Sequence, residues 1–224
     1  MKPIRLFRKN RPRPVQFLKD LVAYLRLRAD SDFWETLEPV FDRSSSTGCD
    51  YSELLKIHRH VLRHRPTAIL ELGSGVSTVV IAHAVKRLAA GGHVCRFVSM
   101  EEGPEWHRQL QEIFPEALRS HVELLQSETH DRHLPNGLIA RAYLHKPALA
   151  YDFVFIDGPQ VPKKGGYFDA DILDVLDWNE NAFVAFLDQR IATRAALRQV
   201  MPWARMTANR EFAVFRVPPA AARV

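Results

Sequence analysis

The segment with the clearest potential for chemistry is a short apolar run that ends in an acid and two closely spaced glycines, Glu71-Leu72-Gly73-Ser74-Gly75. The glycines allow a tight turn and a close approach of the backbone to a ligand. A helical pattern follows, and the first turn of a helix offers unpaired N–H groups and the positive end of the helix dipole. The segment therefore predicts a turn that binds a nucleotide-like ligand, beside a helix end that suits a carboxylate.

A nicotinamide or flavin dinucleotide is the competing ligand for such a turn. Its fingerprint requires a third glycine at the position of Thr78, and it places the acid that binds ribose about 20 residues further on. Here the acid that ends the next predicted strand, Glu101, lies 26 to 28 residues beyond the two glycines. Both departures disfavour a dinucleotide, and an NAD(P)-dependent oxidoreductase is kept as an alternative function.

Acids also end two later predicted strands of the chain. Glu101 and Glu102 follow an apolar segment directly, and a carboxylate with its two oxygens is well suited to the vicinal diol of a ribose. Asp157 ends the run Phe153-Val154-Phe155-Ile156, and a charge at the end of a buried strand is rarely there for packing. It could take a proton, orient a hydroxyl or bind a metal, with a helix N-cap as the structural alternative.

The elements that would position these residues alternate along the chain. The predicted strands are Thr67–Leu72, His93–Met100, Val122–Leu125, Tyr151–Ile156 and Ala182–Leu187, with helices at Tyr51–Arg63, Ser77–Ala89, Pro104–Ile113 and Ile191–Val200. Such alternation indicates an α/β fold with a parallel sheet covered on both faces. Two last strand-like segments, Trp203–Thr207 and Glu211–Val217, are too close together for a crossover helix and must pair antiparallel.

The turn at Glu71–Gly75 resembles motif I of the class I methyltransferases that use S-adenosylmethionine, and the resemblance extends from about Tyr51 to Val217. It implies a Rossmann-like, doubly wound sheet, mostly parallel and seven-stranded, with a C-terminal antiparallel hairpin. In that family the glycines line the methionine part of the cofactor, and the acid at the position of Glu71 helps to hold its amino group. The cofactor-binding residues that the resemblance implies are Glu71, Gly73, Ser74, Gly75, Glu101 (with Glu102 as a substitute), Ser127 and Glu128, the last two as candidates for the adenine contact.

The residues that follow the fourth predicted strand indicate the type of methyl acceptor. The chain has Asp157-Gly158-Pro159-Gln160 where methyltransferases acting on amino groups of bases or glutamine carry Asn/Asp-Pro-Pro-Tyr, which favours an oxygen acceptor. The Ile-Asp-Gly form resembles the branch associated with small molecules and saccharides. Methyl transfer is an in-line displacement, in which positioning and deprotonation of the nucleophile are what a protein can add, and Asp157 is the predicted catalytic residue.

A divalent metal is the weaker alternative at the same place. Asp157, Asp188 and Gln189 resemble the metal ligands of the metal-dependent O-methyltransferases, and carboxylate and amide oxygens suit magnesium or calcium. That family has Asn at the position of Gln189, whose longer side chain displaces the oxygen, so no metal is favoured. In the following loop, Lys163, Lys164 and Tyr167 are candidates to meet an acidic or sugar substrate, and a solvated loop is the equal alternative.

Composition and charge set the wider frame. The 224 residues carry a net charge of +5, but residues 1–28 hold nine Lys or Arg against one acid, so this segment is +8 and the rest of the chain is −3. A basic surface over the catalytic fold is therefore not expected, which argues against nucleic acid as a partner. No apolar run approaches the roughly 20 residues of a membrane span, and Cys49 and Cys95 are expected to be reduced thiols of a cytoplasmic protein.

Three regions are predicted: a basic N-terminal arm with an amphipathic helix at residues 1–30, a helical lead-in at 31–66, and an S-adenosylmethionine-binding domain at 67–218. The first helix is predicted from an apolar face of Val15, Leu18, Leu21, Val22 and Leu25. It is expected to pack on its own domain, and peripheral membrane or protein contact through residues 1–28 is the alternative. A non-catalytic cofactor-binding or assembly module recruited by the basic arm is kept as a further alternative.

Overall fold

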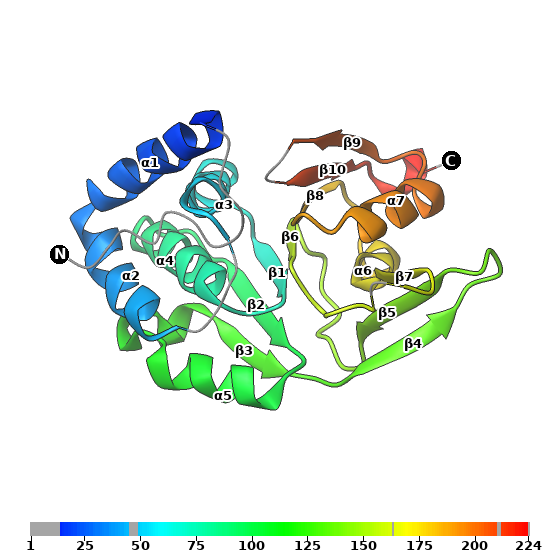
Figure 1. Ribbon diagram of the computed structural model, residues 1–224, viewed down its shortest axis with the longest axis horizontal. Coiled ribbons are helices and arrows are strands. Elements are labelled where there is room, and N and C mark those ends of the chain that lie inside the picture. Colours follow the sequence, from blue (N-terminus) through cyan, green and yellow to red (C-terminus); the bar gives the residue numbers. More distant parts are fainter. Residues whose placement is uncertain (1–13, 45–48, 163, 210–211, 224) are drawn as a thin grey trace.

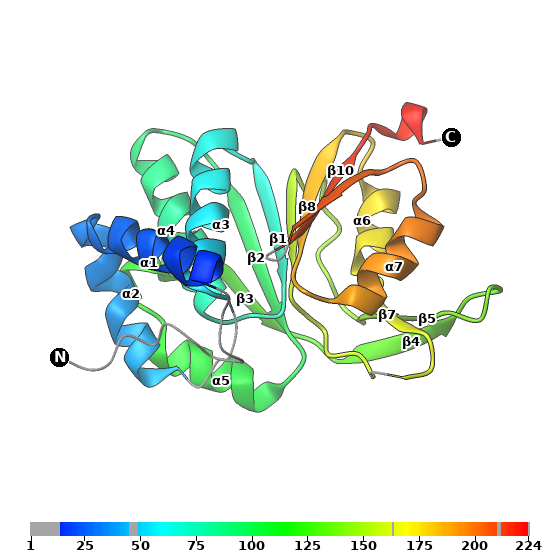
Figure 2. The ribbon, with the colours of Figure 1, turned by 45° about the horizontal axis from the view of Figure 1, so that its top comes forward.

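The computed structural model describes residues 14–44, 49–162, 164–209 and 212–223, and the predictions for the basic residues before position 14 and for Lys163 lie outside that part. A seven-stranded sheet runs through the molecule, with helices on both faces (Figure 1, Figure 2). Its strands, in spatial order, are β3 (Glu123–Gln126), β2 (Arg96–Glu101), β1 (Ala68–Leu72), β6 (Phe153–Ile156), β8 (Phe183–Leu187), β10 (Ala213–Val217) and β9 (Arg205–Ala208).

One strand of this sheet runs against the others. β10 pairs antiparallel with β8 and with β9, whereas the remaining neighbours pair in parallel. The prediction of a mostly parallel seven-stranded sheet with a C-terminal antiparallel hairpin is thus confirmed.

The central strands are apolar because both of their faces are covered. Every residue of β1 and of β6 is buried, as expected for parallel strands between two helical layers. Successive side chains of β1 enter different cores, since Ile69 packs with the helices of one face and Leu70 with those of the other. Because β1, β2, β6 and β8 pair in parallel, their carboxyl ends lie at one edge of the sheet.

The helices divide between the two faces. Figure 1 shows α1 (Pro14–Arg28), α2 (Ser31–Arg43), α3 (Tyr51–His64), α4 (Val76–Ala90) and α5 (Pro104–Ile113) on one side, and α6 (Asp171–Trp178) and α7 (Ile191–Val200) on the other. Short 3-10 turns lie at Glu116–His121 and Ala220–Ala222. α6 is not among the elements that the sequence predicts, whereas the other helices lie where it places them.

A second sheet lies in a region for which the sequence predicts no strands. β4 (Thr129–His133), β5 (Ile139–Tyr143) and β7 (Tyr167–Asp169) form a three-stranded sheet, with β4 antiparallel and β7 parallel to β5. The polar sequence of β4 lies mostly exposed, so no apolar alternation marks it as a strand. Its stability comes from pairing with β5, whose partly buried face packs under the main sheet.

The prediction of which face the first helix buries is wrong. α1 packs on its own domain, but the face that it buries contains Ala23, Tyr24 and Leu27. The apolar residues Val15 and Leu18 of the predicted packing face are exposed instead. None of the helices in the described part of the chain is long and apolar enough to cross a membrane.

Candidate active site

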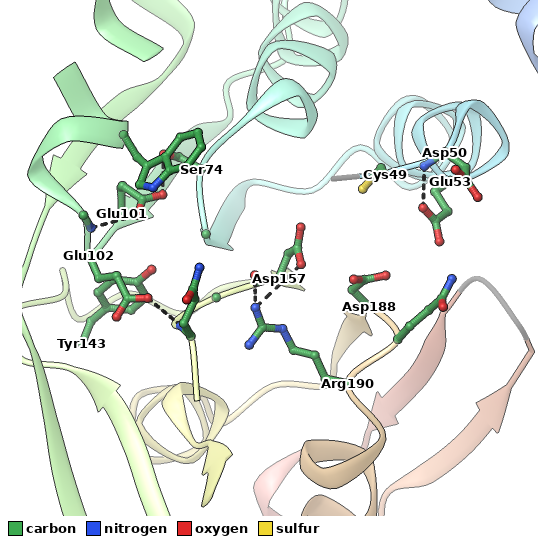
Figure 3. Close-up of a pocket in the computed structure, with 16 residues that line it drawn as sticks. Cys49, Asp50, Glu53, Ser74, Glu101, Glu102, Tyr143, Asp157, Asp188 and Arg190 are labelled. Atoms are coloured by element: carbon green, nitrogen blue, oxygen red, sulfur yellow. Dashed lines mark hydrogen bonds and ion pairs between the residues drawn. The ribbon is translucent and has the colours of Figure 1, made fainter. Parts of the chain in front are cut away.

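A cavity of about 670 Å³ opens at the edge of the sheet where β1, β2, β6 and β8 end (Figure 3). The first turn of α3 forms a further part of its wall. The lining residues at the strand ends are Gly73 and Ser74, Glu101 to Gly103, Asp157 and Gly158, and Asp188 to Arg190; Cys49, Asp50, Glu53, Trp106, Tyr143 and Gln160 complete the wall. The position is the one in which open α/β sheets bind their ligands.

Two glycines hold the loops after β1 and β6 against each other. Gly73 has a φ of +90°, which disfavours any residue with a Cβ, and its N–H donates to the Met100 carbonyl at 3.0 Å. A Cβ on Gly73 would lie 2.7 Å from the carbonyl carbon of Asp157 and 2.7 Å from the nitrogen of Gly158. A Cβ on Gly158 would meet Gly73 in the same way. Gly73 is therefore required by contact between two loops, and this contact sets where Asp157 stands.

Thr78, which stands where a dinucleotide-binding turn has its third glycine, caps the first turn of α4. Thr78 is fully buried, and its Oγ1 accepts the N–H of Gly75 at 2.8 Å and lies 3.2 Å from the Ser99 hydroxyl. The N–H of Gly75 is therefore already hydrogen-bonded within the first turn of α4 and is not available to a ligand. Gly75 is not one of the residues that line the cavity. Thr78 closes the space in which a dinucleotide fold would keep a glycine.

Glu71 lies behind the turn and not in the cavity wall. It is fully buried, and its Oε2 accepts the hydroxyl of Ser99 at 2.6 Å. Its other oxygen, Oε1, has no partner among the described residues. Burial raises the pKa of Glu71 to about 7, against the hydroxyls of Ser77 and Ser99, which lower it. A buried oxygen without a partner is costly unless a ligand or water reaches it.

Glu101 and Ser74 meet at the cavity wall. The Ser74 hydroxyl donates to Glu101 Oε2 at 3.2 Å, and the Gly103 N–H donates to Glu101 Oε1 at 2.9 Å. Burial raises the pKa of Glu101, and these two donors lower it. The neighbouring Glu102 also lines the cavity, where its Oε1 accepts the N–H of Gln160 at 2.6 Å. Of these two acids, Glu101 is the one held in place by two donors.

The two candidates for an adenine contact lie outside this wall. Ser127 is buried, donates to the Glu128 carbonyl at 3.0 Å and accepts the N–H of His145 at 3.0 Å. Glu128 is exposed. Trp106 of α5, which was not predicted as a site residue, lines the cavity, and its half-exposed ring also borders a second cavity of about 540 Å³. The only hint in the sequence is an aromatic residue shortly after the acids of β2.

Asp157 stands next to a second acid and a cation. Burial raises the pKa of Asp157 well above its usual range, the negative charge of Asp188 raises it further, and Arg190 opposes both. The Arg190 guanidinium lies 3.8 Å from Asp157 Oδ1 and donates to the backbone carbonyl of Asp157. It also pairs with Asp169 at 3.0 Å, which anchors it from the other side. Arg190 was not predicted as a site residue, although it directly follows the acid–amide pair after β8.

The alternative metal ligands converge, but beside a positive charge. Asp157, Asp188 and Gln189 all line the cavity. Arg190 lies 3.8 Å from Asp157 Oδ1, so a divalent ion held by Asp157 would be close to a like charge, which repels it. Within the part of the chain that the structure describes, no group of three or more His, Cys, Asp or Glu is placed to hold a metal. The donor set therefore fits a metal poorly.

Glu53 reaches the same space from outside the sheet. The Asp50 N–H donates to Glu53 Oε2 at 2.6 Å, which caps α3, while Glu53 Oε1 has no partner among the described residues. Figure 3 shows the carboxylates of Glu53, Asp157 and Asp188 around a common opening. Glu53 was not predicted as a site residue, because Asp-x-x-Glu at the start of an apolar helix is typical of a capping box. In contrast, the predicted Lys164 and Tyr167 do not line the cavity, and Tyr167 lies under the guanidinium of Arg141.

Glu53 should make stability depend on pH. Burial, with the charge of Asp188 next, raises its pKa to about 8 from an ordinary value of 4.5. The folded state then holds a proton that the unfolded state has lost, so stability falls as the pH rises from about 4.5 to about 8. We expect Glu53→Gln, which cannot ionise, to gain stability relative to the wild type over this range, by at most about 1.4 kcal/mol per pH unit.

Denaturant unfolding at pH 5, 6.5 and 8 in buffer with EDTA measures this difference. Glu105→Gln is the control, because Glu105 is exposed on α5 and should give a difference that does not change with pH. A constant difference for Glu53→Gln as well would contradict the assignment.

Comparisons with known proteins support the fold. No family model and no curated protein matches the chain. Among solved structures, it is similar to the S-adenosylhomocysteine-bound methyltransferase PaMTH1 of Podospora anserina, with a TM-score of 0.56 and 12% identity over 93% of this chain and 98% of that one.

Two further solved structures have the same arrangement. A putative caffeoyl-CoA O-methyltransferase of Staphylococcus aureus matches with a TM-score of 0.55 and 11% identity over 89% of this chain and 99% of that one. The O-methyltransferase TomG of Streptomyces achromogenes, in complex with S-adenosylmethionine, matches with a TM-score of 0.51 and 15% identity over 91% and 96%. The chain thus has the fold of the class I methyltransferases.

Proposed function

We propose that this protein is an S-adenosylmethionine-dependent methyltransferase that acts on an oxygen atom of a small molecule, with a saccharide as one candidate acceptor. The observation that carries the proposal is the cavity at the carboxyl ends of β1, β2, β6 and β8, with Glu101 held by Ser74 and Gly103 at its wall. The solved structures with the same fold include O-methyltransferases, one of them in complex with S-adenosylmethionine.

The residues present fit this cofactor. Glu101 presents a buried, doubly supported carboxylate that suits a ribose diol, and Gly73 and Ser74 offer a turn without a bulky side chain. The cavity wall includes six acids, Asp50, Glu53, Glu101, Glu102, Asp157 and Asp188, against the cation of Arg190. A positively charged ligand is favoured by those acids that are ionised, and its charge would lower the raised pKa values of Glu53 and Asp157 and so help to ionise them as well. The cofactor carries its transferable methyl group on a positively charged sulfur. Glu71, behind the turn, would act through the residues that it supports.

Binding calorimetry tests the proposal against its alternatives. We expect the protein to bind S-adenosylmethionine and S-adenosylhomocysteine, and to show no binding of NAD or NADP at the same concentrations. The oxidoreductase is disfavoured because Thr78 fills the place of the third glycine and β10 runs antiparallel at the end of the sheet. Binding of a nicotinamide dinucleotide alone would overturn the proposal.

Asp157 is the proposed catalytic residue. Its carboxylate lines the cavity beside Arg190, and its raised pKa makes it a stronger base when ionised than an exposed carboxylate. It would take the proton of the acceptor hydroxyl or orient that hydroxyl. Arg190 would hold the loop of Asp157 through the backbone carbonyls of Asp157 and Pro159.

We expect Asp157→Asn to lower turnover by about 10²-fold or more while affinity for S-adenosylmethionine changes by less than about threefold, because general acid–base catalysis contributes roughly 10²–10⁴-fold. Transfer of a labelled methyl group to a panel of phenols, hydroxy acids and monosaccharides measures turnover. The control is Asp177→Asn, at an exposed position on α6. Unchanged turnover of Asp157→Asn would show that Asp157 is structural, and binding without transfer to any acceptor would favour the non-catalytic module.

A further inference from the structure

The outer face of α1 is an apolar stripe that nothing in the described chain covers. The exposed fractions are 67% for Val15, 59% for Leu18, 38% for Val22 and 55% for Leu25. These positions follow one another at intervals of three and four residues, so they form one face of the helix. Five of the nine exposed large apolar side chains of the described residues lie on α1, with Phe17 as the fifth. A contiguous exposed patch of this kind marks an interaction surface.

The orientation of α1 about its own axis is set by its inner face. Asp20 is buried and accepts the backbone N–H of Ser52 at 2.9 Å, at the start of α3. The ring of Tyr24 lies 5.2 Å from that of Trp34 and 5.2 Å from that of Tyr51. Turning the stripe inward would break these contacts and leave the Asp20 carboxylate without its donor. The stripe therefore faces outward for a structural reason.

The exposed charges of α1 itself are all of one sign. Lys19, Arg26 and Arg28 are exposed, and the acid of α1, Asp20, is turned into the protein. The sequence before the helix adds six more Lys or Arg between positions 1 and 13. Apolar residues flanked by basic ones are the composition of helices that lie in the interface of an anionic bilayer.

We propose that α1 docks this protein on an anionic lipid bilayer, with Val15, Leu18, Val22 and Leu25 entering the interface and the basic residues meeting the lipid headgroups. A second copy of the chain is a poorer occupant. A two-fold interface through this face would bring Lys19 and Arg26 of each copy against the same positive surface of the other. An anionic membrane satisfies both the apolar stripe and the charge. The inference is independent of the proposed methyl transfer.

Vesicle flotation with the full-length protein tests this proposal. We expect binding to vesicles of 70% phosphatidylcholine and 30% phosphatidylglycerol, at least tenfold weaker binding to pure phosphatidylcholine, and weakening by 0.5 M salt. The double variant Leu18→Glu/Val22→Glu should lose at least tenfold in binding to the anionic vesicles. Lys19→Glu/Arg26→Glu should also weaken it, because the charge around the stripe is reversed.

The matched control is Val94→Glu/Ile191→Glu, which adds the same charge at two exposed apolar positions away from α1 and should bind as the wild type does. Thermal unfolding and binding of S-adenosylmethionine serve as readouts that the fold of each variant is intact. Equal binding by the α1 and control variants would overturn the proposal. So would light scattering that shows a dimer in solution which Leu18→Glu/Val22→Glu dissociates, because the stripe would then be covered by a second copy.

Discussion

Gly73→Ala is expected to destabilise the protein by roughly 2–5 kcal/mol and to abolish detectable binding of S-adenosylmethionine. Its φ of +90° costs a residue with a Cβ roughly 1–2 kcal/mol. The new Cβ would also press on the backbone of Asp157 and Gly158 at 2.7 Å, and overpacking of this kind costs roughly 1–3 kcal/mol. Because the atoms in the way are backbone, the loops after β1 and β6 must separate, and Asp157 moves with them.

Gly92→Ala is the matched control for this prediction. Gly92 also has a positive φ, of +78°, but a Cβ there has nothing within 4 Å. It should cost only about 1–2 kcal/mol for the backbone conformation and leave cofactor binding unchanged. Thermal and denaturant unfolding with calorimetric titration of the cofactor measure both variants. Equal losses for the two alanines would show that the contact between the loops contributes nothing.

Glu101→Ala is expected to weaken binding of S-adenosylmethionine by about two to four orders of magnitude. The carboxylate would accept hydrogen bonds from both ribose hydroxyls, and each hydrogen bond to a charged group is worth roughly 1.5–3 kcal/mol. The substitution also leaves the Ser74 hydroxyl and the Gly103 N–H without their acceptor. Calorimetric titration gives the loss, and Glu101→Gln, which keeps one acceptor oxygen, should fall between the wild type and the alanine variant.

Two further variants separate Glu101 from its neighbours. Glu105→Ala removes an exposed acid in the first turn of α5 and should leave affinity within about twofold, because screened exposed charges contribute little. Glu102→Ala tests the substitute, which lines the same cavity but accepts the N–H of Gln160. A larger loss for Glu102→Ala than for Glu101→Ala would reassign the ribose contact to Glu102.

Several features of the site could be predicted because they are local. A parallel strand between two layers must be apolar, so a polar residue such as Asp157 at its end is visible in the sequence. The acids Glu101 and Asp188 follow the same rule, and all three meet in one cavity because parallel strands end at one edge. The link between β9 and β10 is too short for a crossover helix, so the two strands could be predicted to pair antiparallel.

Other features could not be predicted because they depend on contacts between distant segments. Glu53 belongs to a capping box of α3 and reaches the cavity only because the first turn of that helix lies beside Asp157 and Asp188 in the cavity wall. Ser127 follows β3 as predicted, yet its hydroxyl accepts the backbone N–H of His145, which lies in the bend after β5. Arg190 gains its role from Asp169, a partner on β7 that no local pattern pairs with it.

The sequence by itself determined the glycine turn, the acids at the strand ends and the order of strands and helices, since each is written in neighbouring residues. Only the tertiary structure decided why Gly73 must be a glycine, because its Cβ would meet the loop after β6. It also decided which face of α1 is exposed. The helix is apolar on two sides, and the hydrogen bond from the Ser52 N–H to the Asp20 carboxylate fixes which of them is buried. Periodicity reports that a face is apolar, and packing against the rest of the chain selects the face that is buried.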